Sequence, residues 1–247
     1  MYRLSFFSFI VFVFLGCTPA KLPLTVSYQG YRVNPQVAVD TGLQNMLTPY
    51  AATVNSTMNK VIGFANTTLT KKMPENTLGN FMTDCFQKMG AEKFGKKIHI
   101  AFMNQGGIRA DINKGNITIG HIYELMPFDN ILVLQDLRGD ILEQFIQLNA
   151  ADGGWPISSG SSYTIKDKKA VDIMIDGKPL DKTAMYTVAS SDYIANGGSN
   201  ASMLKTIPQQ NRGYLLRDAL LDYIQQITNT GKPVEAKQEK RVIKANE

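Results

Sequence analysis

The sequence predicts an α+β fold with mixed sheets. Apolar residues recur with helical spacing in some segments and alternate in others, and these segments do not follow a uniform strand–helix–strand rhythm. The chain has 247 residues, of which 44% are apolar and 19% charged, so the composition is that of an ordinary globular protein with room for a sizeable core. We therefore expect one domain, or a compact pair of subdomains, without repeats of solenoid type.

Residues 1–16 are expected to form a signal peptide. They hold one charged side chain, Arg3, and an unbroken apolar run over residues 9–15 that is too short to span a bilayer. The sequence FLGC, which ends at Cys17, resembles a bacterial lipobox. We expect lipidation at Cys17 and a position on the periplasmic face of a bacterial membrane, reached through this lipid anchor. Simple secretion and an uncleaved anchor remain as alternatives.

A lipidated tether over residues 17–39 should lead into a domain over residues 40–247. The clearest helix of the domain carries six apolar residues at i, i+3, i+4, i+7, i+8 and i+11, which places them on one face. The elements expected in the first half are a strand near Leu24–Tyr28, a helix over 41–60, a strand within 61–70, the clear helix over 78–89 with its end at Gly90 or Gly95, and a strand over 96–104.

The second half of the chain alternates between helical and strand patterns without a fixed rhythm. A glycine turn at Asp176-Gly177 separates two alternating runs, which is typical of antiparallel strands. The expected elements are a short helix over 118–126 that Pro127 ends, a strand over 130–137, a helix over 139–151, several strands within 161–189, a helix over about 214–227 and an edge strand over 240–244.

Several kinds of chemistry lack their residues in this sequence. The second cysteine, Cys85, has only Cys17 as a partner, so we expect no disulfide framework and a buried Cys85 on a helix. His99 and His121 are the only histidines and have no paired ligand at metal spacing, so structural or surface roles are expected. A G-x-S-x-G elbow, a P-loop and a G-x-G-x-x-G motif are also missing. No complete catalytic or metal centre is therefore expected in this chain.

The stretch HIAFMNQGGIRADI brings polar groups to the end of an apolar strand. Asn104 offers an amide, Gly106 and Gly107 let a ligand approach the backbone, and Arg109 offers a planar fork for carboxylate or phosphate. A tight turn with a surface arginine is an equally good interpretation of these residues alone.

Two further loops carry aromatic residues close to strand ends. Phe128 and Asn130 lie in ELMPFDN, and Tyr193 precedes Gly197-Gly198 in SSDYIANGGSN. Rings held in such loops stack on planar bases, each stack being worth about 1–3 kcal/mol. The alternative is that both rings anchor their loops to the core.

Taken together, these stretches resemble the C-terminal domain of the 5'-nucleotidase family. The shared patterns are N-x-G-G-I-R, G-x-I-T, P-F-x-N, and a Y-x-V-A strand that leads to F-x-A-x-G-G-D, and they run in the family's order over about residues 40–229. The resemblance implies a layered α/β/β/α fold with mixed sheets. It also implies that the domain holds the nucleoside part of a nucleotide, while a metallophosphatase domain supplies two metal ions and the attacking water.

The resemblance assigns roles to particular residues of this chain. Phe128 and Tyr193 would clamp the base and Asn130 would bind near its edge. The other substrate-binding positions implied are Asn104, Gly106 and Gly107 beside the nucleoside, Arg109 at the ribose or phosphate, Ser199 at the sugar, and Lys72 where the family often has arginine. Three positions depart from the family pattern. Ser199 replaces an aspartate, which puts sugar binding in doubt, and Gln105 replaces a glycine. Tyr193 replaces a phenylalanine, which keeps a ring face for stacking.

The resemblance leaves the status of this chain as an enzyme uncertain. The main hypothesis is the substrate-specificity half of a split 5'-nucleotidase, in which a separate metallophosphatase subunit carries the divalent metals and this chain has no cofactor. The alternatives are a stand-alone nucleoside-binding lipoprotein without catalysis and a scaffold that has lost its ligand. Nucleic acid is not expected as a partner, because no dense basic face with interleaved aromatic residues occurs.

Overall fold

The central sheet of the computed structural model has four strands in the order β2-β8-β4-β9. They are β2 (Ile100–Ala101), β8 (Met185–Ser191), β4 (Ile131–Arg138) and β9 (Gln209–Leu215). β2 pairs in parallel with β8, whereas β4 is antiparallel to both β8 and β9, so the sheet is mixed as the sequence predicts. The ends of β2 and β8 and the start of β4 consequently lie along one edge, where three loops meet.

Each face of the central sheet contributes to a different hydrophobic core. Successive residues of a strand point to opposite faces of the sheet, so adjacent residues belong to different cores. Ala101 and Ala189 belong to one core, whereas Ile100 and Val188 belong to the other. The first core holds α2 (Thr77–Phe94), α6 (Leu216–Asn229), β1 (Val61–Ala65) and β3 (Gly115–Thr118). The second core holds α4 (Gly139–Ala151) and strands of the second sheet.

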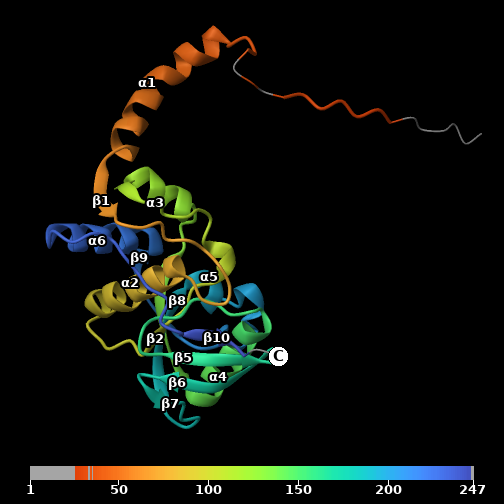
Figure 1. The fold of residues 1–247 in the computed structure, drawn as a ribbon, viewed down its shortest axis with the longest axis vertical. Coiled ribbons are helices and arrows are strands. Elements are labelled where there is room, and N and C mark those ends of the chain that lie inside the picture. Colours follow the sequence, from red (N-terminus) through yellow and green to blue (C-terminus); the bar gives the residue numbers. More distant parts are fainter. Residues whose placement is uncertain (1–25, 33, 35, 246–247) are drawn as a thin grey trace, which may run out of the picture. The chain divides into compact units, whose positions relative to one another are not determined.

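The second sheet has the order β10-β5-β6-β7 and packs against α4, as Figure 1 shows. Its strands are β10 (Val242–Lys244), β5 (Ser162–Lys166), β6 (Lys169–Ile175) and β7 (Lys178–Pro179). β10 pairs with β5 alone, so the predicted edge strand over 240–244 is confirmed. The remaining helices are α1 (Thr41–Met58), α3 (Ile119–Leu125) and α5 (Asp192–Ala195).

The helix with the clearest pattern in the sequence corresponds to α2, and it is capped at both ends. The side chain of Asn76 accepts a hydrogen bond from the Gly79 amide at its start, and Gly95 ends it in the left-handed conformation, with φ 66°. Gly95 rather than Gly90 is therefore the true end. Cys85 is fully buried on this helix, as predicted.

Other predictions for secondary structure are wrong or incomplete. Val26 and Tyr28 are exposed and belong to no strand, so the strand expected near Leu24–Tyr28 is not formed by its described part. The strand expected over 96–104 contains only the two residues of β2. The short strand β3, the polar strand β9 and the single turn α5 were not predicted as elements.

The structure describes residues 26–245 except 33 and 35. The chain divides into two units, residues 1–46 and 47–247, and every strand found among the described residues belongs to the second unit. The predicted signal peptide, most of the tether and Cys17 lie outside the described residues. No helix in the described part has the length and apolar character needed to cross a bilayer.

Candidate functional site

A cavity of about 450 Å³ opens where the three loops meet at the edge of the central sheet. Most of the substrate-binding positions predicted from sequence line it, and only Arg109 and Lys72 do not. The lining residues are Asn104, Gln105, Gly106, Gly107, Phe128, Asn130, Asp152, Trp155, Tyr193 and Ser199. Residues 105–107 form one turn of 3-10 helix shortly after β2, and Asn104 is the N-cap residue of this turn.

Phe128 lies in the loop that enters β4, and the residue is 39% exposed. The guanidinium of Arg217, at the start of α6, binds this loop. It donates to the Phe128 carbonyl at 3.4 Å and to the Asp129 carboxylate at 2.7 Å, and it lies 4.2 Å from the centre of the Tyr123 ring. The loop backbone is thus fixed while the Phe128 ring faces the cavity.

Tyr193 lies on α5, and the residue is 49% exposed. Its hydroxyl accepts a hydrogen bond from the Ser199 amide at 3.2 Å, so the ring leans over the glycine turn. A Cβ on Gly198 would lie 2.5 Å from the Tyr193 ring, which shows that only glycine leaves room for this ring position. Phe128 and Tyr193 take part in none of the ring–ring contacts among the described residues.

Asp192 connects the two loops that carry these rings. One carboxylate oxygen accepts hydrogen bonds from the amides of Ile131 and Tyr193, each at 2.9 Å. The first amide belongs to the start of β4 and the second to α5. The positions of Phe128 and Tyr193 are therefore tied through a single side chain.

The turn after β2 supplies polar groups to the cavity. The Asn104 amide donates to the Ser199 hydroxyl at 3.4 Å, whereas its oxygen and that of Gln105 are buried without a partner. Buried polar atoms are rarely left unpaired in proteins, so these oxygens mark a place where a ligand or water completes the pairing. A Cβ on Gly107 would lie 2.0 Å from the methyl group of the buried Met103 side chain, which would have to shift to admit it.

Asp152 and Trp155 line the cavity but were missed by the sequence interpretation. Trp155 is 1% exposed, and its indole N–H donates to the Asp152 carboxylate at 2.6 Å. Both lie in the turn after α4, around Gly153-Gly154, which carries no charge pattern or familiar spacing. Their place beside Phe128 and Tyr193 depends on contacts between distant segments, which a single sequence does not display.

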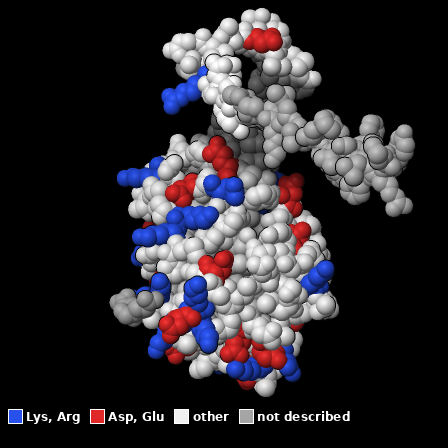
Figure 2. All heavy atoms as spheres, turned by 90° about the vertical axis from the view of Figure 1, so that its right-hand side faces the viewer, with Lys and Arg blue, Asp and Glu red and all other residues white. Residues whose placement is uncertain are grey.

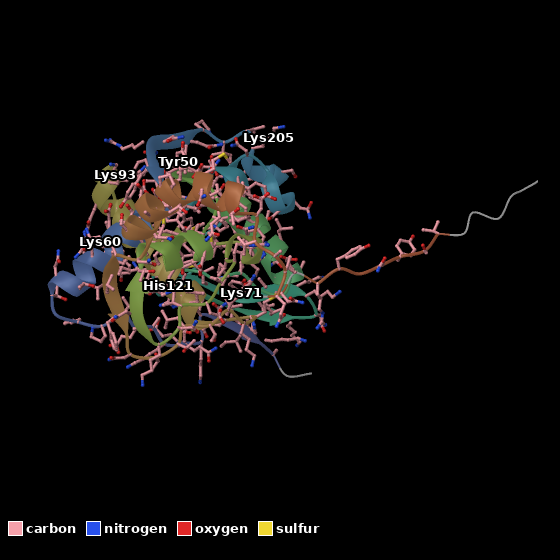
Figure 3. All side chains as sticks on the ribbon, turned by 90° about the horizontal axis from the view of Figure 1, so that it is seen from above. Tyr50, Lys60, Lys71, Lys93, His121 and Lys205 are labelled. Atoms are coloured by element: carbon pink, nitrogen blue, oxygen red, sulfur yellow. The ribbon has the colours of Figure 1, made fainter. Side chains whose placement is uncertain are left out.

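Two predicted basic residues do not line the cavity. Arg109 is exposed, and among the described residues its guanidinium donates only to the Gly106 carbonyl, at 3.4 Å. Lys72 is exposed, and its carbonyl accepts a hydrogen bond from Asn76. The neighbouring Lys71, labelled in Figure 3, donates instead to the Ile108 carbonyl at 3.0 Å, directly after the turn that lines the cavity.

Both histidines have structural contacts. The Nδ1 atom of His99 accepts a hydrogen bond from the Thr187 amide at 2.9 Å, and that of His121 accepts one from the Thr118 amide at 3.3 Å. Among the described residues, no group of three or more His, Cys, Asp or Glu side chains has the arrangement of a metal site.

Two larger cavities, of about 650 and 510 Å³, contain none of the predicted site residues. The first lies between the β5–β6 turn and the end of α4, and lysine side chains contribute to its wall. The second lies between β1 and α6. Of these three cavities in the described part of the chain, the one at the sheet edge combines exposed aromatic rings with unpaired amide oxygens, which are features that bind a planar polar molecule.

Comparison with known proteins identifies the class to which this fold and cavity belong. Residues 50–206 match the model of the family described as "5'-nucleotidase, C-terminal domain". The chain is a member of this family, in agreement with the motifs in its sequence.

Two curated relatives illustrate the membership. The chain is 27% identical over 203 residues to the silent protein UshA(0) of Salmonella typhimurium, across 78% of this chain and 36% of that protein. It is 31% identical over 176 residues to the trifunctional nucleotide phosphoesterase protein YfkN of Bacillus subtilis, across 64% of this chain and 12% of that protein. The chain thus spans well under half the length of these relatives.

Solved structures agree with the fold. The 5'-nucleotidase precursor from Thermus thermophilus superimposes with a TM-score of 0.68 at 30% identity, over 84% of this chain and 44% of that one. The sulfate thiohydrolase SoxB of a Thermus species gives a TM-score of 0.63 at 16% identity, which reflects the fold alone. The layered α+β fold with mixed sheets is therefore confirmed.

Proposed function

We propose that this chain binds a nucleoside or nucleotide in the cavity at the sheet edge and is the substrate-specificity half of a 5'-nucleotidase. In this proposal, phosphomonoester hydrolysis requires a separate metallophosphatase chain, which carries the divalent metals. The chain is exported and anchored to a membrane through Cys17. Family membership and the nucleotide phosphoesterases among the relatives support this assignment.

One observation carries the proposal. Phe128 and Tyr193 come from different loops, remain partly exposed, and line the same cavity without packing on other rings. Two partly exposed rings in one cavity can stack on a planar group, and a heterocyclic base is a partner that such stacking favours. Asn130 lies next to them and offers an amide for the edge of the base.

The other polar groups suit the sugar and phosphate. Asn104 and Ser199 offer an amide oxygen and a hydroxyl inside the cavity. The guanidinium of Arg109 has a single weak hydrogen bond among the described residues, so it is free to turn toward an anion outside the cavity. On the face shown in Figure 2, acidic and basic side chains lie close together, so the field of this face offers little long-range attraction to a charged ligand.

Fluorescence provides a direct test of binding. Trp155 is the only tryptophan of the chain and lies in the wall of the cavity. Titration with adenosine and AMP should therefore change the emission of this residue, and calorimetry should give the dissociation constants. Phe128→Ala and Tyr193→Ala should each weaken binding about 5- to 150-fold, the equivalent of one lost stack of about 1–3 kcal/mol.

Phe64 provides a matched control for these substitutions. It is a phenylalanine of comparable exposure, 46%, in β1 and away from the cavity. Phe64→Ala should leave nucleoside affinity unchanged. Equal affinities in the wild type and in both cavity variants would show that the stacking proposal is wrong.

The enzymatic part of the proposal needs its own assay. The full chain is mixed with a metallophosphatase candidate, and phosphate release from AMP is compared with that of the candidate alone. A higher rate, abolished by Tyr193→Ala, supports a split enzyme. Binding without any rate gain or complex formation would instead indicate a nucleoside-binding protein without catalysis.

A further inference from the structure

We infer that Asp152 makes the cavity selective for ligands with neighbouring hydroxyl groups, such as the two hydroxyls of ribose. This inference rests on the proposed function, because it assumes that a nucleoside base lies between Phe128 and Tyr193. It assigns a specificity-determining role to a residue outside the motifs of the sequence.

The position of Asp152 gives the first argument. It lines the main cavity together with Ser199, and the same two residues line an adjoining cavity of about 380 Å³. Asp152 and Ser199 therefore lie where the two spaces join. A ligand whose base occupies the aromatic end of the main cavity would extend its sugar toward this junction.

The hydrogen bonds of Asp152 give the second argument. Its Oδ2 atom accepts the indole N–H of Trp155 at 2.6 Å, which fixes the orientation of the carboxylate. Its Oδ1 atom has no hydrogen-bond partner among the described residues. Asp152 is exposed at the wall of the cavity, so this oriented oxygen, an acceptor only, is open to water or to a donor group on a ligand.

The electrostatic setting of Asp152 gives the third argument. It is the C-cap residue of α4, where the helix dipole disfavours a negative charge. None of the ion pairs among the described residues includes it, so no cation offsets this effect. A residue that contradicts a local preference without compensation is a candidate for a functional role.

The chemistry of the pair then limits the ligand. A carboxylate next to a hydroxyl repels an anionic group, so the phosphate of a nucleotide does not belong at this junction. Two adjacent ligand hydroxyls fit, since one can donate to Asp152 while the other exchanges a hydrogen bond with Ser199. A charge-assisted hydrogen bond of this kind is stronger than one between neutral groups.

The test compares ribonucleosides with their 2',3'-dideoxy counterparts. Adenosine, guanosine, cytidine and uridine, each with its dideoxy form, are titrated into the full chain, with calorimetry and Trp155 emission as readouts. The wild type should bind the ribo form of its preferred base about 10- to 150-fold more tightly, as expected for hydrogen bonds to a charged group. Asp152→Asn should reduce this ratio at least about fivefold while leaving dideoxy affinity unchanged.

Asp152→Asn keeps the acceptor for Trp155 and the shape of the side chain, so folding should persist. Asp167→Asn removes an equal charge on the β5–β6 turn and should leave the ratio unchanged. Equal ribo and dideoxy affinities, or an equal loss of both in Asp152→Asn, would overturn this inference while the proposed function stands. If the wild type binds no nucleoside, the proposed function and this inference are both overturned.

Discussion

Tyr193 illustrates how much of the cavity depends on single atoms. Its hydroxyl accepts the Ser199 amide, and its ring lies against the Cα of Gly198. A methyl group at Gly198 would meet the ring at 2.5–2.6 Å and the Tyr193 carbonyl at 2.5 Å. Backbone as well as side chain would have to move, so the glycine sets the ring position.

We therefore expect Gly198→Ala to weaken nucleoside binding about as much as loss of the ring does, about 5- to 150-fold. The cause would be displacement of Tyr193, which calorimetry with adenosine measures. Gly30→Ala serves as control, since a Cβ there meets no atom within 4 Å. Unchanged affinity in Gly198→Ala would show that the observed ring position is not needed.

At the scale of elements, the sequence predicts what local patterns determine. The apolar stripe of α2 and the glycine at its end appear in the sequence, and the helix forms as expected. β9 was missed because it is an edge strand whose middle residues are all exposed, so no alternation marks it. The strand expected before residue 29 has suitable residues but no sheet to join in the described part of the chain.

The same limit applies to the candidate site. The motifs around Asn104, Phe128 and Tyr193 are visible because each joins aromatic or amide groups to turn-forming residues within a few positions. Asp152 and Trp155 reach the cavity only through the packing of α4 on the central sheet. Long-range packing of this kind leaves no local signal.

Asp136 gives the central sheet a pH-dependent contact. From β4 it accepts hydrogen bonds from Thr187 on β8 at 2.7 Å, from Gln210 on β9 at 3.1 Å, and from Lys96 at 3.0 Å. Burial alone raises the pKa of this carboxyl, but the hydrogen bonds from Thr187, Lys96 and Gln210 and the charge of Lys96 outweigh it and lower the pKa below the ordinary value.

A lowered pKa in the folded state stabilises the protein above the unfolded pKa of about 3.9, and this contribution is lost as the pH falls through the folded value. Asp136→Asn should therefore reduce the free energy of unfolding at pH 7 by about 0.5–1 kcal/mol, a small effect because the side chain is 40% exposed. In urea titrations the difference from wild type should shrink below about pH 4. Glu124→Gln, which removes an exposed carboxylate without such contacts, should show no comparable trend; a difference independent of pH would contradict the assignment to Asp136.

At the scale of the folded unit over residues 47–247, the C-terminal segment joins the two hydrophobic cores. The Val234 amide donates to the Phe64 carbonyl beside the first core, and β10 pairs with β5 beside the second. Between these points Arg241 forms a two-pronged ion pair with Asp84 of α2 and donates to the Ile157 carbonyl.

Loss of this ion pair should destabilise the whole unit. The Arg241 side chain is 6% exposed and that of Asp84 28%, so Arg241→Ala leaves a partly buried carboxylate without its cation. We expect a loss of about 3 kcal/mol, the lower end for a broken buried pair. Unfolding in guanidinium chloride measures this loss as a lower transition midpoint, provided that the m-value stays unchanged. Arg241→Lys keeps the charge but not the planar guanidinium, so its stability should lie between those of the wild type and Arg241→Ala. Equal stability of all three proteins would show that the segment does not hold the cores together.

The carboxylate of Asp192, which joins the start of β4 to α5, has a consequence for how a ligand enters. Because both aromatic loops share this anchor, neither has to search for its position when a molecule arrives, and little mobility is left to lose on association. The ligand should then bind to a site that is already formed. The association rate should depend mainly on the orientation of the incoming ring, and the residence time on the strength of its contacts.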